Sequence, residues 1–261
     1  MRKCVRHVPG MGWMPPSDWS MLQSGELPKT LDPLSLRNYL VVMPAYNESR
    51  FVGEIIEKLR KWHVDVLVVD DGSTDGTGDL AKEAGAEVLR LEGNQGKGAA
   101  LSAGFAYAQK QGYDAVVTMD ADGQHDPKDV FRFFDVYNRT GIPVLVGNRI
   151  YDRKRMPRLR RITNDVMSSM LNRRMKQYIA DTQNGFRLYQ TDVINMVRSE
   201  SKGFAAESEI LLKLDEIGIR MGSVPVAAIY GSERSYIRPW QDTRRFFTMM
   251  RHYRRHRLWQ A

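Results

Sequence analysis

From Tyr39 onward, short apolar runs alternate with amphipathic segments of helical period, and this alternation strongly limits the possible folds. Runs rich in Val and Leu predict strands at Leu40–Met43, Val66–Val69, Val116–Met119 and Val144–Val146. The segments between and after them predict helices at Gly53–Lys61, Thr77–Ala84, Lys97–Gln111 and Pro127–Thr140. Apolar strands joined by helical crossovers predict an α/β fold, a mostly parallel Rossmann-like sheet with helices on both faces. Right-handed crossovers would bring the C-terminal end of every strand to one edge, where such sheets bind ligands.

The rest of the chain is less regular. The later segments predict a basic helix at Leu159–Tyr178, strands at Gln183–Tyr189 and Val224–Tyr230, and a helix at Ser208–Ile217. Residues 1–38 have no sustained period and predict an irregular N-terminal extension. We therefore expect one domain over residues 39–240, followed by a basic amphipathic tail over residues 241–261.

The net charge of +8 is unevenly distributed along the 261 residues. Residues 149–176 hold ten Lys and Arg against two acids, and residues 234–257 hold eight Arg against one acid. Two cationic patches on an acidic body leave nucleic acid, anionic membrane and phosphorylated substrates as candidate partners. The single cysteine, Cys4, excludes an intrachain disulfide framework and favours a reducing compartment. No apolar run approaches the roughly 18 residues of a membrane span, and no apolar segment follows the basic start as in a secretory signal.

Carboxylates follow two of the predicted strands directly. Asp70 and Asp71 end one strand, and Asp120 and Asp122 follow another, two residues apart and so on one side of an extended chain. Paired carboxylates disfavour each other's ionisation unless a cation lies between them. Oxygen ligands of this kind, with Gln124 as a neutral third, predict Mg²⁺ or Mn²⁺ completed by substrate phosphates. The alternative is that these acids are present only because Asp favours turns. That alternative does not explain why acids directly follow two buried strands.

Two further segments are candidates for binding a nucleotide. Tyr46 and Glu48 follow the first strand and could stack on and hydrogen-bond a nucleobase or ribose, or could simply pack and begin a helix. The glycine-rich segment Gly93–Gly98 precedes a predicted helix, so its N–H groups and Lys97 could meet an anion, or it could be only a helix cap. Its glycine spacing matches neither a Walker loop nor a dinucleotide fingerprint.

Taken in order, these motifs resemble the family 2 glycosyltransferases of the GT-A fold. The resemblance is carried by Val42-Met43-Pro44-Ala45-Tyr46-Asn47-Glu48, Val68-Val69-Asp70-Asp71-Gly72-Ser73-Thr74-Asp75-Gly76-Thr77, Asn94-Gln95-Gly96-Lys97-Gly98 and Asp120-Ala121-Asp122-Gly123-Gln124-His125. Asp181-Thr182-Gln183-Asn184-Gly185-Phe186-Arg187 further resembles the D-x-x-x-G-F motif of the polyprenyl-phosphate (dolichyl-phosphate-type) branch. The match covers about residues 39–240.

The resemblance implies a role for each matching residue. It places Pro44, Tyr46, Glu48 and Asp71 at the nucleoside of a sugar-nucleotide donor, and Lys97 near its base or diphosphate. Asp120, Asp122 and Gln124 would position the metal, and Arg234 would reach the donor diphosphate. Arg149 would lie near the acceptor phosphate, as would Arg160, one turn before Asn164, where the branch often has Ser. Asp122, Arg149 and Arg160 are therefore the candidate catalytic residues.

The expected reaction is an inverting transfer of a hexose from a GDP-mannose or UDP-glucose type donor to a polyprenyl phosphate. A lipid monophosphate is largely ionised at neutral pH and needs cations rather than a general base. A saccharide hydroxyl in cell-envelope polysaccharide synthesis is the alternative acceptor; it needs a base, for which Glu207 or Asp181 are candidates. The Q-x-x-R-W motif usual in such relatives is absent from this sequence. A nucleic-acid-binding role is disfavoured, because the motif-bearing edge is acidic.

The expected location is the cytoplasmic face of a membrane, with the protein bound peripherally. Residues 149–176 would contact the acceptor or an anionic membrane surface, and a separate membrane-anchoring subunit is a further candidate partner. The tail, if helical, could lie in the bilayer interface or could pack Phe246, Met250 and Tyr253 onto the domain. Both alternatives stay open at this level.

Overall fold

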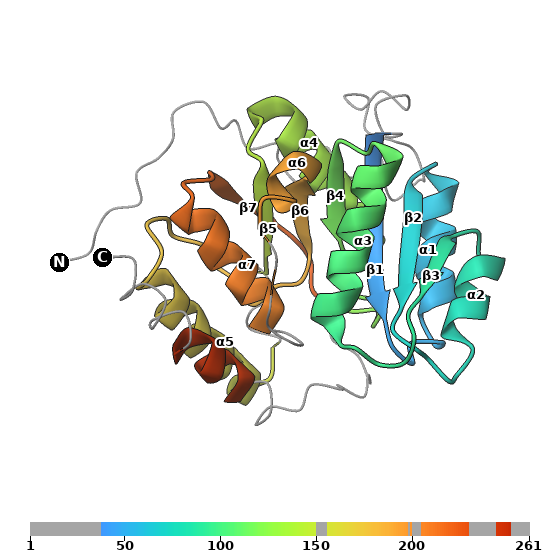
Figure 1. Ribbon diagram of the computed structural model, residues 1–261, viewed down its shortest axis with the longest axis horizontal. Coiled ribbons are helices and arrows are strands. Elements are labelled where there is room, and N and C mark those ends of the chain that lie inside the picture. The colour runs from blue at the N-terminus through green and yellow to red at the C-terminus, as the bar shows by residue number, and fades with distance from the viewer. Residues whose placement is uncertain (1–37, 150–155, 198, 200–204, 230–243, 252–261) are drawn as a thin grey trace.

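The fold is built around one seven-stranded sheet. The computed structural model describes residues 38–149, 156–197, 199, 205–229 and 244–251. The strands are β1 (Tyr39–Ala45), β2 (Asp65–Asp70), β3 (Glu87–Arg90), β4 (Ala115–Thr118), β5 (Val144–Asn148), β6 (Arg187–Gln190) and β7 (Met221–Pro225). They lie in the order β3-β2-β1-β4-β6-β5-β7 (Figure 1). All neighbours are parallel except at β6, which runs antiparallel to both β4 and β5.

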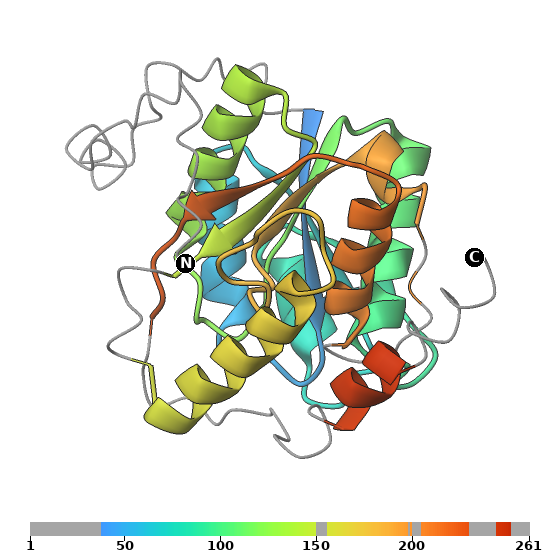
Figure 2. The same ribbon diagram turned by 90° about the vertical axis from the view of Figure 1, so that its left-hand side faces the viewer.

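Helices cover both faces of this sheet (Figures 1 and 2). They are α1 (Val52–Lys61), α2 (Thr77–Glu83), α3 (Lys97–Gln111), η3 (Pro127–Asp129), α4 (Val130–Thr140), α5 (Arg158–Asn172), α6 (Thr191–Ile194) and α7 (Ala205–Glu216). Residues 244–251 are helical as well. The predicted α/β architecture, mostly parallel and covered on both faces, is confirmed.

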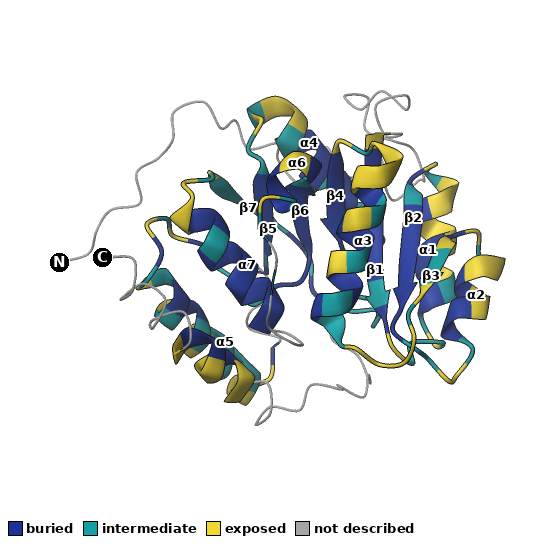
Figure 3. Cartoon of the chain, viewed as in Figure 1, coloured by how far each residue is buried: buried dark blue, intermediate teal, exposed yellow. Residues whose placement is uncertain are grey.

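Alternate residues of the strands supply two separate cores. In β1, Val41 and Met43 pack in one core with α1 and α4, whereas Leu40 and Val42 pack in the other with α3 and α7. A strand that buries both faces must be apolar at every position, which is why these strands appear in the sequence as unbroken Val and Leu runs. The sheet therefore has no solvated face, and Figure 3 shows its strands buried beneath helices that are exposed on their outer sides.

Several predicted elements have other bounds in the structure. The predicted helix Leu159–Tyr178 ends at Asn172, because the Asn172 side chain pairs with both backbone groups of Ile179 and closes a loop. The strand predicted at Gln183–Tyr189 is β6, which begins later, at Arg187. The strand predicted at Val224–Tyr230 is β7, which begins earlier, at Met221. The segment Pro127–Thr140 divides into η3 and α4.

Two features of the sheet differ from the sequence expectation. The edge strand β3 is half-exposed and has charged ends, so it lacks the apolar run that marks the inner strands. The expectation that every strand's C-terminal end lies at one edge is wrong for β6, whose N-terminal end lies there instead.

The tail is described only in part. In residues 244–251, Phe246, Met249 and Met250 are buried in the core that contains α3 and α7, and Arg174 donates to the Met250 carbonyl at 2.8 Å. The packing alternative therefore holds for Phe246 and Met250, while Tyr253 lies outside the described residues. The domain boundaries predicted at residues 38 and 240 stay predictions.

Candidate active site

The predicted site residues that the structure describes gather at one edge of the sheet, the lower edge in Figure 1. This edge holds the C-terminal ends of β1, β2, β4 and β5 together with the start of β6. Ala45 at the end of β1 pairs in register with Asp70 at the end of β2, and Thr118 of β4 pairs with Arg187 of β6. The parallel topology thus brings motifs that are far apart in the sequence onto one surface.

The segment after β1 is held by the segment after β2. Asn47, which has a left-handed φ of 57°, receives a bond from the Thr74 N–H and donates its own N–H to the Ser73 hydroxyl. The Glu48 N–H donates to Thr77 Oγ1 at 2.9 Å. Tyr46 remains 41% exposed, which leaves its ring accessible to a ligand.

The Glu48 carboxyl faces the acids that follow β4. Burial raises its pKa to about 8, and the nearby charges of Asp122, Asp120 and Asp75 act in the same direction. Glu48 and the Asp120–Asp122 turn therefore lie in one electrostatic cluster, although the two motifs are more than seventy residues apart in the sequence.

Asp71 shapes the glycine-rich segment before α3. Its two carboxylate oxygens accept the N–H groups of Gln95 and Gly96, both at 2.7 Å. Gly72 has a φ of +75°, and a Cβ there would lie 2.7 Å from the Gly93 backbone. The sequence Asp71-Gly72 thus presses the loop against the end of β2 and fixes the start of α3, where Lys97 lies.

Lys97 forms a bridge between two parts of the site. Its Nζ lies 2.6 Å from Asp120 Oδ1 and 3.2 Å from Glu207 Oε2, on α7. Burial alone would lower the pKa of Lys97, but the charges of Asp120 and Glu207 raise it above its usual value. Burial likewise opposes ionisation of Asp120, yet the positive charge of Lys97 holds the pKa of Asp120 below its usual value.

Gly185 allows this bridge to form. A Cβ at Gly185 would lie 2.8 Å from Lys97 Nζ, 2.9 Å from Asp120 Oδ2 and 3.1 Å from Glu207 Oε1. Three polar atoms thus crowd against the bare backbone, and any larger residue would separate them. The glycine of the D-x-x-x-G-F motif therefore has a steric explanation in this structure.

The turn after β4 carries the candidate metal ligands. Burial and the neighbouring Asp120 charge raise the pKa of Asp122 to about 6, and the Gln124 N–H donates to Asp122 Oδ1 at 3.0 Å. Gln124 Oε1 accepts from Arg160 at 3.0 Å. Among the described residues, no three His, Cys, Asp or Glu side chains form a group that could hold a metal alone.

The donor set nevertheless fits a divalent cation that is shared with a substrate. The charge of Asp120 raises the pKa of Asp122, and this repulsion marks a place where a positive charge would be stabilising. Two carboxylates and one amide oxygen are hard ligands, too few for Mg²⁺ or Mn²⁺ without additional oxygens. The oxygens of a diphosphate would supply them.

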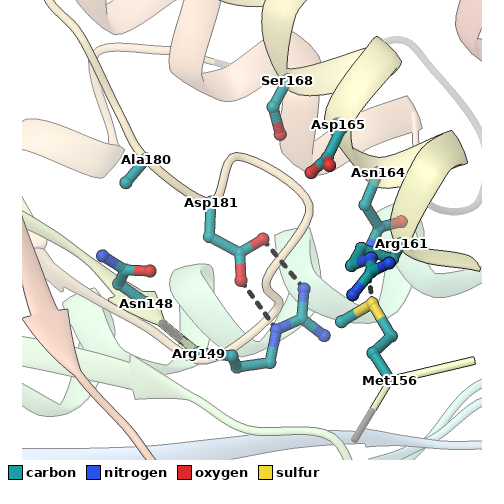
Figure 4. A pocket seen from close by; sticks show the side chains of 9 residues that line it. All are labelled: Asn148, Arg149, Met156, Arg161, Asn164, Asp165, Ser168, Ala180 and Asp181. Carbon is teal, nitrogen blue, oxygen red and sulfur yellow. Dashed lines mark hydrogen bonds and ion pairs between the residues drawn. The ribbon is translucent and has the colours of Figure 1, made fainter. Parts of the chain in front are cut away.

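Arg149 lies beyond this turn, at the end of β5. Its guanidinium forms a bidentate ion pair with Asp181, at 2.7 and 2.9 Å. Figure 4 shows the pair among the residues that line a small pocket. Arg161 also lines this pocket, together with Asn148, Met156, Asn164, Asp165, Ser168 and Ala180. The two neighbouring arginines of α5 therefore face different places: Arg160 contacts Gln124, and Arg161 lines the pocket.

Sequence reasoning missed some residues of the site. Arg187 is fully buried, and its guanidinium donates to the carbonyls of Thr182, Asn184 and Glu207. His125 is buried against Phe186, with ring centroids 4.8 Å apart, and burial lowers its pKa to about 4, which keeps it neutral.

The sequence offered Glu207 only as a candidate base and gave no sign of its contact with Lys97. Arg234 lies outside the described residues.

A family model and sequence relatives identify the class of protein. The model described as glycosyl transferase family 2 matches residues 40–197, more than half of the chain. An undecaprenyl-phosphate mannosyltransferase of Micrococcus luteus is 32% identical, over 73% of this chain and 83% of its own. A polyprenol monophosphomannose synthase of Mycolicibacterium smegmatis is 30% identical, over 78% and 81% respectively. The chain belongs to glycosyltransferase family 2 and is a glycosyltransferase.

Solved structures agree on the fold. A mannosyl-3-phosphoglycerate synthase from Rubrobacter xylanophilus has a TM-score of 0.65 at 18% identity, covering 87% of this chain and 77% of that one. A glucosyl-3-phosphoglycerate synthase from Mycobacterium tuberculosis, solved with Mn²⁺, UDP-glucose and phosphoglyceric acid, has a TM-score of 0.63 at 19% identity, covering 94% and 84%. At these identities the likeness establishes the GT-A fold.

None of the described helices combines the length and the apolar character that crossing a bilayer requires.

Proposed function

We propose that this glycosyltransferase moves a hexose from a nucleotide-sugar donor, of the GDP-mannose or UDP-glucose type, to a polyprenyl phosphate. The reaction would invert the anomeric configuration, use Mg²⁺ or Mn²⁺, and take place at the cytoplasmic face of a membrane. One observation carries the proposal: consecutive arginines of α5 connect the acidic turn to the pocket, Arg160 at Gln124 and Arg161 beside Arg149. The site thus has a place for a cation next to a place for an anion.

On the donor side, the residues after β1, β2 and β4 would hold the nucleotide sugar. Tyr46 and Glu48 stand on the loop beside the end of β2, where a nucleoside would lie between them and the Gly93–Gly98 segment. A divalent ion held by Asp120, Asp122 and Gln124 would neutralise the diphosphate as it leaves. Lys97 adds a second positive charge beside Asp120, through the ion pair between these two residues.

On the acceptor side, Arg149 and Arg161 would hold the lipid phosphate, and Arg160 would lie between that phosphate and Gln124. One of its oxygens would form a bond to the anomeric carbon while the bond to the diphosphate breaks and its electron pair leaves with the diphosphate. No proton has to be removed, because the phosphate is already ionised. An incoming phosphate would share Arg149 with Asp181 or replace that carboxylate, since the ion pair already engages the Nε and one Nη of the guanidinium.

Two findings support a phosphate rather than a hydroxyl as the acceptor. The candidate general bases Asp181 and Glu207 each already have a cationic partner, Arg149 and Lys97 respectively. The names of the sequence relatives point the same way: besides the two bacterial enzymes, a Haloferax volcanii relative, 30% identical over 71% of this chain, is a dolichyl-phosphate hexose transferase.

The decisive experiment incubates the purified protein with Mn²⁺ or Mg²⁺, a panel of sugar nucleotides and a polyprenyl phosphate, and identifies the lipid product by mass spectrometry. Asp122→Asn or a chelator is expected to lower transfer at least about 100-fold, because the leaving diphosphate loses its counter-charge. Asp126→Asn is the matched control: this acid of the same turn caps η3, a role that Asn fulfils equally well.

Undiminished transfer by Asp122→Asn would exclude the metal assignment. A product formed only on saccharide hydroxyls, with no polyprenyl-linked sugar from any donor, would exclude the proposed acceptor.

A further inference from the structure

One face of α5 exposes an apolar row. Leu159, Ile162 and Val166 are 74%, 57% and 48% exposed, an unusual amount for three large aliphatic side chains on one helix. Their spacing of three and four residues places them within about 60° of one another around the helix. We call these three residues the outer row of α5. Figure 3 shows the exposed side of α5 turned away from the sheet.

The opposite face of the same helix lines the pocket that contains Arg149. Arg161, Asn164, Asp165 and Ser168 all border that pocket, and helical geometry sets their mean direction about 140° from that of the outer row. Helix α5 therefore lies between the candidate acceptor pocket and the surface that the outer row exposes. The two faces lie on opposite sides of one helix, whose diameter is about 10 Å.

The surroundings of the outer row are positively charged. Arg158 at the start of α5 and Arg173 and Lys176 just beyond its end are exposed or half-exposed, and Asp165 is the single acid within α5. Arg244, Arg245 and Arg251 are exposed on the helical residues 244–251, which contact the end of α5 through Arg174 and Met250. An exposed apolar row flanked by cations is the composition of a helix that lies in the interface of an anionic bilayer.

We propose that the outer row of α5 docks on an anionic lipid surface and brings the pocket of Arg149 to the level of the lipid head groups. The proposal deepens the function proposed above and rests on it for the membrane-borne substrate. A single row of three aliphatic residues is narrow for a protein interface, which buries about 800 Å² on each side. It is sufficient for shallow insertion, with the long arginine side chains reaching the phosphates.

The test uses the full chain and liposomes without donor or acceptor. Wild type should bind vesicles that contain phosphatidylglycerol, bind phosphatidylcholine vesicles much more weakly, and dissociate as salt rises. The variant Leu159→Ser/Ile162→Ser/Val166→Ser should bind anionic vesicles at least tenfold more weakly. The matched control is Leu80→Ser/Met196→Ser/Ile217→Ser, which changes three exposed apolar residues elsewhere in the fold and should bind like wild type. Thermal melting checks that both variants are folded.

A second measurement compares acceptors. The outer-row variant should keep its turnover on a short, water-soluble polyprenyl phosphate and lose it on a long-chain acceptor embedded in vesicles. The docking proposal is overturned if the outer-row variant binds vesicles as wild type does, or if wild type binds none. It is also overturned if wild type is a dimer that the outer-row variant dissociates, since a second copy would then cover the row. Vesicle binding without transfer to any polyprenyl phosphate would instead reject the proposed function and leave the docking face standing.

Discussion

Among single residues, Arg187 holds together the backbone that surrounds the site. It begins β6, is fully buried, and donates to the carbonyls of Asn184 at 2.6 Å and of Thr182 and Glu207 at 2.8 Å. These bonds connect the loop before β6 to the start of α7. Arg187→Met is expected to lower the free energy of unfolding by about 3 kcal/mol or more, because several buried carbonyls lose their donor at once. Urea denaturation measures the change.

Lys58→Met is the control at this scale. Lys58 forms an i,i+4 pair with Glu54 on the surface of α1, where the two side chains are 48% and 68% exposed, and such pairs contribute less than about 1 kcal/mol. Equal losses of stability in the two variants would show that the buried bonds of Arg187 contribute nothing beyond an ordinary surface pair.

Among elements, the contact between α3 and β1 sets the position of Lys97. Helix α3 approaches the sheet through Gly104, where a Cβ would lie 2.4 Å from Val42 Cγ1. Gly104→Ala is therefore expected to destabilise the fold by about 1–3 kcal/mol through overpacking, although alanine is the better helix former. Thermal and urea unfolding measure the loss, and adding Val42→Ala should recover part of it as a coupling between the two sites.

The opposite sign is expected for the same substitution on α1. A Cβ at Gly53 would have no neighbouring atom within 4 Å, so Gly53→Ala should stabilise the fold by up to about 1 kcal/mol. A stabilising effect of Gly104→Ala would mean that α3 does not pack on β1 as closely as the structure shows.

In the molecule as a whole, the residues proposed for the donor and those proposed for the acceptor belong to two halves that meet where β4 pairs with β6. Thr118 Oγ1 donates to the Gly185 carbonyl at 2.8 Å between the two halves. The ion pair of Lys97 with Glu207 lies next to Gly185. If the halves act separately, Arg149→Gln should raise the KM for polyprenyl phosphate at least about tenfold, because it removes a charge-assisted fork. The Kd of the nucleoside diphosphate, measured by calorimetry with Mn²⁺, should stay within about twofold.

Arg160→Gln makes the comparison sharper. Arg160 contacts Gln124, so its loss should alter nucleoside diphosphate binding as well as acceptor use. Equal effects of Arg149→Gln on donor binding and on acceptor KM would refute the division into two halves.

The sequence by itself determined the class of fold and supplied most of the candidate site residues, because those signals are local. A strand buried on both faces must be apolar throughout, which made β1, β2, β4 and β5 readable, while the edge strand β3 was not. Acids directly behind two such strands indicated the edge of the sheet that holds the site. The order of the motifs then indicated the family, which the family model confirms.

Only the tertiary structure decided which of these residues meet. That β6 runs antiparallel, that Lys97 pairs with Glu207, and that Arg160 and Arg161 face different places are all outcomes of contacts between distant segments. No local pattern encodes them, since a charged side chain looks the same in the sequence whether its partner is one turn away or, like Glu207 for Lys97, on another helix. Long-range pairing is set by the packing of the whole chain, and the structure is where it becomes visible.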